Sequence, residues 1–242
     1  MNTKALLLGR SLYLMFLVMV STSTHSIDYE SNVIVATDFS SSYYVKDRFP
    51  DIEDNFKKLS SAMTSREAKS IRPLLFQVIP IDELSQAKGT ICEYTIQRKR
   101  LTSGRNACDG EAACSVKAKD VKTYIQDICA KTIIKRPTGE GTDIEGALSL
   151  AGQLSSAQRA KTTYLFIFSD MHEFRDVNIV STPPNLDGFK VFVICGGVNS
   201  VQGFCMTQEQ HWTKRLKKYG ADSVEFVVES SRWGRVAKDG FQ

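Results

Sequence analysis

Histidine and proline are scarce in this chain, whose 242 residues include only three histidines and six prolines. The sequence has no H-E-x-x-H zinc motif, no G-x-S-x-G nucleophile turn and no G-x-x-x-x-G-K-S/T phosphate loop. It also has no C-x-x-C pair, no internal repeat and no proline-rich linker. These absences argue against zinc proteases, α/β-hydrolases and P-loop nucleotide enzymes, because each class performs its chemistry through the missing motif.

The composition is that of one globular domain. Hydrophobic residues make up 42% and charged residues 24% of the chain, which is enough apolar material for one sizeable core. The formal net charge is +4, and it falls by two if Lys4 and Arg10 are removed with a leader. This small charge indicates no particular partner. We expect no nucleic-acid binding, because the basic run Arg98–Arg100 suits the protective charges of an edge strand.

Residues 1–26 have the order of a signal peptide. Two cations, Lys4 and Arg10, precede the apolar run Ser11–Val20, and a small polar stretch follows. The run is short for a membrane span of about 20 residues, although Ala5–Leu8 could extend it. We therefore expect a cleaved leader and a soluble periplasmic or extracellular domain. The alternative is an N-terminal membrane anchor.

Six cysteines follow this export signal, so disulfides are permitted, and six thiols allow 15 connectivities. Proximity along the chain favours two short loops and leaves one longer pairing. The expected pairs are Cys108 with Cys114, Cys195 with Cys205, and Cys92 with Cys129. A free buried thiol is the alternative for Cys195, which ends an apolar run.

Short hydrophobic runs alternate with amphipathic segments along the chain. The runs are rich in β-branched and aromatic residues and alternate only weakly, as strands buried on both faces do. They are Asn32–Thr37, Leu74–Ile81, Thr162–Ser169, Lys190–Cys195 and Ser223–Val228. The helical segments are 51–63, 116–133, 143–157 and 207–220. This order predicts an α/β fold with a mainly parallel, doubly wound, Rossmann-like sheet and helices on both faces.

Three segments depart from this alternation. Residues 89–102 alternate and are charged, and they follow the preceding strand after a short turn, which predicts one antiparallel edge strand. Residues 102–115 read as a cysteine-containing insertion. The main domain is expected over residues 30–230, and the basic segment 231–242 is expected to be a disordered C-terminal tail, with a docking segment as the alternative.

Oxygen-bearing side chains gather where three predicted strands or loops should meet. In open α/β sheets, ligands bind outside the carboxyl ends of the strands. Asp38, Ser40 and Ser42 follow the first strand, Thr142 stands in a glycine-rich loop, and Asp170 follows another strand. Carboxylates and hydroxyls without sulfur suit a hard divalent cation, with Mg²⁺ expected and Mn²⁺ or Ca²⁺ as alternatives.

These residues resemble the metal-ion-dependent adhesion site of the von Willebrand factor A (vWA, integrin I-like) domain. The segment "DFSSS" matches the family motif D-x-S-x-S, "GEGTD" supplies the threonine, and "FSD" supplies the last aspartate. The resemblance covers roughly residues 32–229. It implies a vWA fold and a metal held by Asp38, Ser40, Ser42, Thr142 and Asp170. Met171 stands where the family usually has glycine, which makes Asp170 the least secure ligand.

Simpler interpretations exist for the same residues. Asp38, Thr142 or Asp143 could each cap a following helix. His172 and Glu173 could line the rim of the metal site, although a solvated polar loop suits them better.

Tryptophan is usually well buried, so Trp212 and Trp233 are expected to pack in the core rather than to anchor a ligand.

Two functions of different classes follow from these features. The resemblance implies a non-enzymatic binding module, in which an Asp or Glu of a protein partner completes the coordination of the metal. The alternative is a metal-dependent phosphatase-like hydrolase that uses Asp38. Haloacid-dehalogenase-like phosphatases carry a second acid two residues after their aspartate, and Ser40 occupies that place here. A membrane partner is expected only if the leader is retained, and the oligomeric state stays open.

Overall fold

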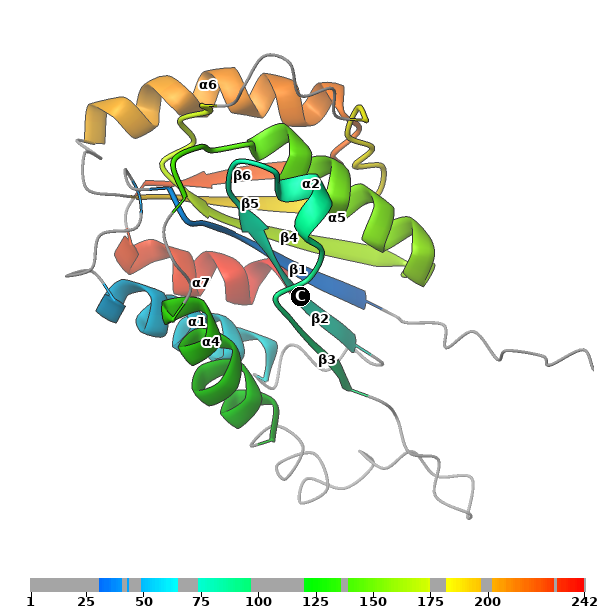
Figure 1. Ribbon diagram of the computed structural model, residues 1–242, viewed down its shortest axis with the longest axis vertical. Helices are drawn as coiled ribbons and strands as arrows, with labels where there is room; N and C mark the ends of the chain where they lie inside the picture. Colours follow the sequence, from blue (N-terminus) through cyan, green and yellow to red (C-terminus); the bar gives the residue numbers. More distant parts are fainter. Residues whose placement is uncertain are drawn as a thin grey trace, which may run out of the picture.

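The computed structural model describes residues 31–40, 43, 49–64, 74–96, 120–135, 139–174, 182–196, 202–228 and 230–241 (Figure 1). The leader, the whole insertion near 102–115 with its pair Cys108 and Cys114, and Ser42 lie outside these residues. No helix in the described part of the chain is long and apolar enough to span a membrane.

A six-stranded sheet forms the centre of the domain, in the order β3-β2-β1-β4-β5-β6. The strands are β1 Ser31–Asp38, β2 Leu74–Ile81, β3 Cys92–Ile96, β4 Thr162–Ser169, β5 Phe189–Cys195 and β6 Ser223–Val227. All neighbouring strands pair in parallel except β3, which runs antiparallel to β2 at one edge. In this register Val35 of β1 lies between Val78 of β2 and Phe166 of β4.

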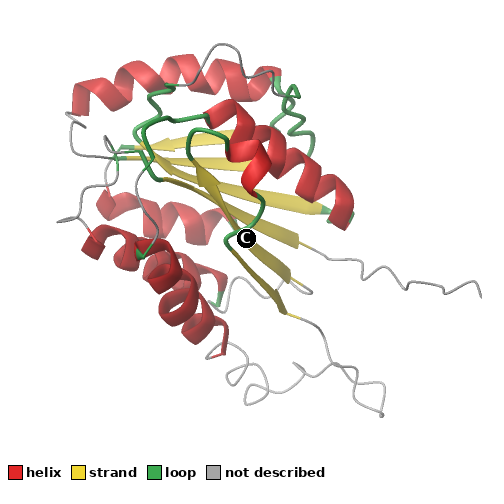
Figure 2. Cartoon of the chain, viewed as in Figure 1, coloured by secondary structure: helices red, strands yellow, loops and turns green. Residues whose placement is uncertain are grey.

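Helices cover both faces of the sheet, as Figures 1 and 2 show. Helices α1, α4 and α7 lie on one face with the π-helical turn η3, and α2, α5 and α6 lie on the other. Their bounds are α1 Phe49–Met63, α2 Ser85–Lys88, η3 Tyr124–Cys129, α4 Ala130–Ile134, α5 Ile144–Gln158, α6 Gln202–Lys218 and α7 Ser230–Gly240. The predicted fold class, including the antiparallel edge strand, is confirmed.

Two hydrophobic clusters, one on each face of the sheet, make up the core. Successive strand residues point to opposite faces. Val33 and Val35 therefore join the cluster that includes Phe56 of α1, while Ile34 and Ala36 join the cluster under α5 and α6. Because both faces are covered, apolar residues occupy consecutive positions, and this explains the weak alternation of the strand sequences.

The C-terminal segment 231–242 was predicted to be a disordered tail, and this prediction is wrong: residues Ser230–Gly240 form α7. Trp233 and Phe241 are buried in the first cluster. The Trp233 indole N–H donates to Asn55 Oδ1 at 2.9 Å, and its ring lies 5.5 Å from that of Phe168. The segment looks polar because its few apolar residues are spaced for a single helical face among basic residues.

Two predicted disulfides are present. Cys92 of β3 is bonded to Cys129 of η3, and Cys195 at the end of β5 is bonded to Cys205 in α6. The alternative of a free Cys195 thiol is therefore wrong. Each bond ties a helical element to the sheet, one at the antiparallel edge strand and one at the carboxyl end of a central parallel strand.

Candidate functional site

The carboxyl ends of β1 and β4 form the point where the strand order reverses. From β1 the chain passes to β2 and β3 on one side, and then crosses to β4 on the other side of β1. Loops leaving two such strands diverge, which creates the crevice where α/β proteins bind ligands. Asp38 is the last residue of β1, and Asp170 directly follows β4.

Asp38 is fully buried at this point. Its Oδ1 accepts a hydrogen bond from the Ser40 backbone N–H at 2.8 Å, and its Oδ2 accepts one from the Ser169 hydroxyl at 2.6 Å. Burial raises the pKa of Asp38 from 3.8 to about 6; the charge of Asp170 adds to the rise, and the hydrogen bonds oppose it. The fold thus holds a carboxylate where its charge is costly.

Ser40 and Thr142 are buried, and each lies in a loop that is joined to another loop of the site by backbone hydrogen bonds. Ser40 forms a parallel bridge with Gly139, whose N–H donates to the carbonyl of Phe39 at 3.0 Å. Thr142 and Phe174 exchange backbone hydrogen bonds of 2.6 and 3.0 Å. These bonds connect the glycine-rich loop with the loop after β1 and with the loop after β4.

Asp170 begins a short turn whose next residue has an unusual backbone conformation. Asp170 is buried, and its Oδ1 accepts from the His172 N–H at 2.9 Å. Met171 has φ 60°, a left-handed conformation that costs a non-glycine residue about 1–2 kcal/mol. Its side chain is buried, and its carbonyl accepts from the Trp212 indole N–H at 2.8 Å. Burial and this bond explain how methionine occupies a position that favours glycine.

Asp143 caps α5, as the simpler interpretation proposed. Its Oδ1 accepts from the Gly146 N–H at 2.8 Å, and its own N–H donates to the Asp82 carbonyl at 2.8 Å. Asp38, by contrast, accepts at Oδ1 from the Ser40 N–H in the loop after β1, well before α1 begins at Phe49. Helix capping therefore accounts for Asp143 and not for the position of Asp38.

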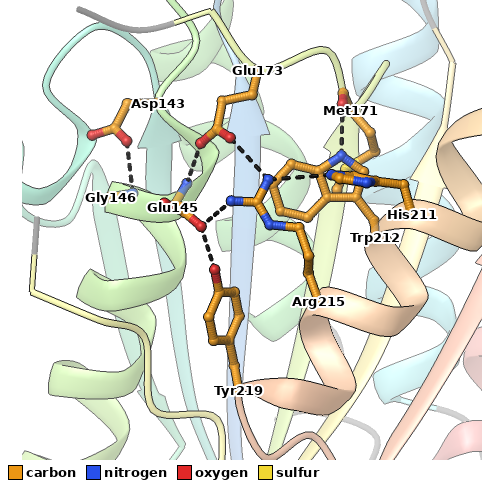
Figure 3. Close-up of polar contacts among 9 residues, drawn as sticks. All are labelled: Asp143, Glu145, Gly146, Met171, Glu173, His211, Trp212, Arg215 and Tyr219. Carbon is orange, nitrogen blue, oxygen red and sulfur yellow. Dashed lines mark hydrogen bonds and ion pairs between the residues drawn. The ribbon is translucent and has the colours of Figure 1, made fainter. Parts of the chain in front are cut away.

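Glu173 was expected in a solvated polar loop, and this expectation is wrong. It lies in a charged cluster with Glu145, Arg215 and Tyr219 (Figure 3). Arg215 Nη1 donates to Glu173 Oε2 at 3.1 Å, and both Arg215 Nη2 and the Tyr219 hydroxyl donate to Glu145 Oε1. His172, by contrast, is exposed. Trp212 and Trp233 are buried as predicted.

Sequence reasoning missed Ser169 and Arg215. Ser169 is the last residue of β4, and its place beside Asp38 follows only once β4 is known to neighbour β1. Arg215 lies three residues after Trp212, so helical spacing puts the two on one face of α6. Nothing in the sequence connects Arg215 with glutamates 42 and 70 positions away.

The donor set fits a hard divalent cation. Asp38, Ser40, Thr142 and Asp170 supply only oxygen, and Asp170 lies close enough to Asp38 for its charge to raise the pKa of Asp38. No described lysine or arginine pairs with either carboxylate. The described residues also hold no group of three or more His, Cys, Asp and Glu side chains suited to a metal. The set formed by the Asp38 and Asp170 carboxylates and the Ser40 and Thr142 hydroxyls suits Mg²⁺ better than zinc, which prefers nitrogen and sulfur ligands.

The mainly parallel sheet with one antiparallel edge strand and helices on both faces agrees with the fold that the family resemblance implies. The fold is vWA-like. No model of a protein family matches the sequence, and no curated protein matches it.

Several solved structures resemble this vWA-like chain. An aerotolerance-related membrane protein from Bacteroides fragilis NCTC 9343 has 12% identity and a TM-score of 0.44, over 87% of this chain and 97% of the other. A von Willebrand factor type A protein from Catenulispora acidiphila has 15% identity and a TM-score of 0.42, over 88% of this chain and 42% of the other. Manganese-loaded TRAP protein from Plasmodium vivax has 12% identity and a TM-score of 0.46, over 88% and 74%. Likeness at these levels concerns architecture alone.

Proposed function

We propose that this chain is an exported vWA-like module that binds a protein partner through a divalent metal ion, with Mg²⁺ as the expected ion. Asp38, Ser40, Ser42, Thr142 and Asp170 would hold it. The observation that carries this proposal is the burial of Asp38 beside Asp170 with no basic partner among the described residues. Two neighbouring buried carboxylates are costly unless a cation compensates them.

The chain's own residues explain how such a site would work. Asp38 and the hydroxyls of Ser40 and Thr142 would contact the ion, and Asp170 would act directly or through water. When bound, the metal supplies a Lewis-acidic position that accepts a carboxylate oxygen from outside the chain. The hydrogen bond from the Gly139 N–H to the Phe39 carbonyl and the pair between Thr142 and Phe174 tie Ser40 and Thr142 to neighbouring loops, which lowers the cost of ordering these two residues on binding. A partner that presents an Asp or Glu fits this position.

Export to an oxidising compartment is part of the proposal. The signal-peptide order of residues 1–26 motivates it, and the disulfides Cys92–Cys129 and Cys195–Cys205 support it, because such bonds persist mainly outside the reducing cytosol. A retained leader would make the same domain membrane-anchored, facing the same compartment.

Peptide selection tests the binding mode without knowledge of the natural partner. The immobilised domain is exposed to a random peptide library in Mg²⁺, and bound peptides are eluted with EDTA. We expect enrichment of Asp and Glu with the wild type and with Glu209→Gln, which removes an exposed acid on α6, but not with Asp38→Asn. The same enrichment in the presence of EDTA, or with Asp38→Asn, would contradict metal-bridged binding.

An assay with p-nitrophenyl phosphate and Mg²⁺ separates binding from hydrolysis. We expect no turnover above background, because Ser40 stands where a phosphatase of this type has its second acid and the sequence offers no convincing general base. Robust turnover that Asp38→Asn abolishes would replace the binding module with a hydrolase.

A further inference from the structure

The loop that carries Asp170 lies against α6 and is bonded to that helix at two places. Near its start, the Trp212 indole N–H donates to the Met171 carbonyl at 2.8 Å. Three residues after Asp170, Glu173 Oε2 accepts from Arg215 Nη1 at 3.1 Å. Figure 3 shows both contacts, with the Arg215 guanidinium beside the Trp212 ring. Neither contact involves a proposed metal ligand.

The left-handed backbone at Met171 makes these contacts important. A non-glycine residue keeps such a conformation only where its surroundings restrain it. Met171 directly follows Asp170, so a relaxed backbone at Met171 would redirect the Asp170 side chain. The Trp212 bond and the buried Met171 side chain provide the restraint at the start of the loop.

Arg215 also reaches the second loop of the site. Its Nη2 pairs with Glu145 in the first turn of α5, and the Glu145 N–H donates to Glu173 Oε1 at 3.2 Å. Glu145 follows closely on Thr142, whose backbone is bonded to Phe174. One guanidinium therefore bonds to both the Asp170 loop and the helix that follows the Thr142 loop.

The chemistry at this point calls for arginine. Glu145 and Glu173 are mostly buried, with side chains 13% and 17% exposed, and both are paired with the Arg215 guanidinium. A planar guanidinium can donate to two carboxylates at once, and here it also lies over the Trp212 ring with its Cζ 4.5 Å from the centroid. A lysine ammonium could compensate the charge but could not reproduce this fork.

We infer that Arg215 is a positioning residue for the metal site: by joining Glu173 to Glu145 and stacking on Trp212, it holds the loop of Asp170 in register with the loop of Thr142. This inference rests on the proposed function, because it assigns Arg215 a role in metal affinity. Arg215 touches no proposed ligand and acts through Glu173 and Trp212.

The charge effect and the positioning effect of Arg215→Gln change Mg²⁺ affinity in opposite directions. Arg215→Gln removes a positive charge near a cation site, so the change in charge alone would tighten Mg²⁺ binding. Loss of positioning would instead weaken it, by about tenfold to a hundredfold for a residue that orients the ligands of a metal. The matched control is Lys214→Gln, which removes the same charge from an exposed neighbour on α6 and is expected to leave the dissociation constant unchanged or slightly lower.

Arg215→Lys is a milder variant that keeps the charge, and it is expected to show an intermediate loss of affinity. All variants are titrated with Mg²⁺ by calorimetry, and each is melted in EDTA to check that it is folded. A role in stability alone would lower the melting temperature and leave Mg²⁺ affinity unchanged. Unchanged or tighter binding by folded Arg215→Gln would overturn the inference.

Amide hydrogen exchange provides a readout that needs no metal. In EDTA, Arg215→Gln is expected to exchange faster than the wild type over residues 170–174, including the Phe174 amide that donates to Thr142, with β1 and β2 unchanged. If the wild type bound no Mg²⁺, the metal proposal would fail, and this comparison alone would decide the role of Arg215. Equal exchange in the two proteins would then refute it.

Discussion

Replacing Asp38 with asparagine should stabilise the metal-free protein at neutral pH. The substitution removes a buried charge and keeps the shape of the side chain. The pKa of Asp38 is raised to about 6, so the folded state disfavours the ionised carboxylate. Each pKa unit corresponds to about 1.4 kcal/mol, and the rise from 3.8 to about 6 amounts to about 3 kcal/mol. Loss of the hydrogen bond from Ser169 would lower the stability of the variant by about 1 kcal/mol, so its free energy of unfolding should rise by about 2 kcal/mol in total.

The pH dependence of this gain has a fixed sign. A carboxyl group with a raised pKa contributes no penalty below its unfolded value of 3.8, because both states are then protonated. The penalty grows as the pH rises from 3.8 to about 6 and is complete above that range. At pH 4.5 it is about 1 kcal/mol, so the asparagine variant and the wild type should be nearly equal in stability.

Urea unfolding in EDTA, at pH 8 and at pH 4.5, measures both values. The variant should gain about 2 kcal/mol at pH 8 and almost nothing at pH 4.5. A loss of stability at pH 8, or the same gain at both pH values, would refute the reasoning from buried charge. With Mg²⁺ at 100 times its dissociation constant, the wild type alone should be stabilised, by about 2.7 kcal/mol.

Two further predictions concern the frame around the site. Gly152→Ala would place its Cβ 2.4 Å from the Asn185 carbonyl oxygen, so we expect the free energy of unfolding in urea to fall by about 1–3 kcal/mol. In the control Gly234→Ala, the atoms nearest to the new Cβ belong to the Lys58 side chain at ordinary contact distance, and we expect unchanged or higher stability. Equal effects would contradict the close packing of α5. Replacing Cys195 and Cys205 with serine opens a loop with a sequence separation of 10 and should cost about 3 kcal/mol, and an unchanged unfolding midpoint would contradict this.

The strands were predictable because burial on both faces gives them a strong local signal. Runs such as Leu74–Ile81 contain consecutive apolar residues, and few other structures bury such a run completely. The short disulfide Cys195–Cys205 was also accessible from proximity along the chain. Helix α7 was missed, because Trp233 and Phe241 stand among basic residues and only the sheet shows where they pack.

Some residues of the candidate site could be predicted from the sequence, and the contacts around them could not. Asp38 and Asp170 could be selected from the sequence because each stands at the carboxyl end of a hydrophobic run. Ligands of open α/β sheets bind at the carboxyl ends of the strands, and such runs can be recognised without a structure. The contacts of Glu173 could not be foreseen, since they depend on a helix 42 residues away that returns beside the loop. The conformation of Met171 likewise depends on Trp212, and no local pattern shows that contact.

Calorimetric titration of the leader-free wild type with Mg²⁺, beside Asp38→Asn, shows directly whether Asp38 belongs to a metal site. We expect saturable binding by the wild type at pH 8 that weakens as the pH falls below about 6, because protons then compete for Asp38. We expect no Mg²⁺ binding by Asp38→Asn, although this variant should still melt cooperatively. Binding that survives in Asp38→Asn, or a folded wild type that binds no Mg²⁺, would contradict a metal site at the carboxyl ends of β1 and β4.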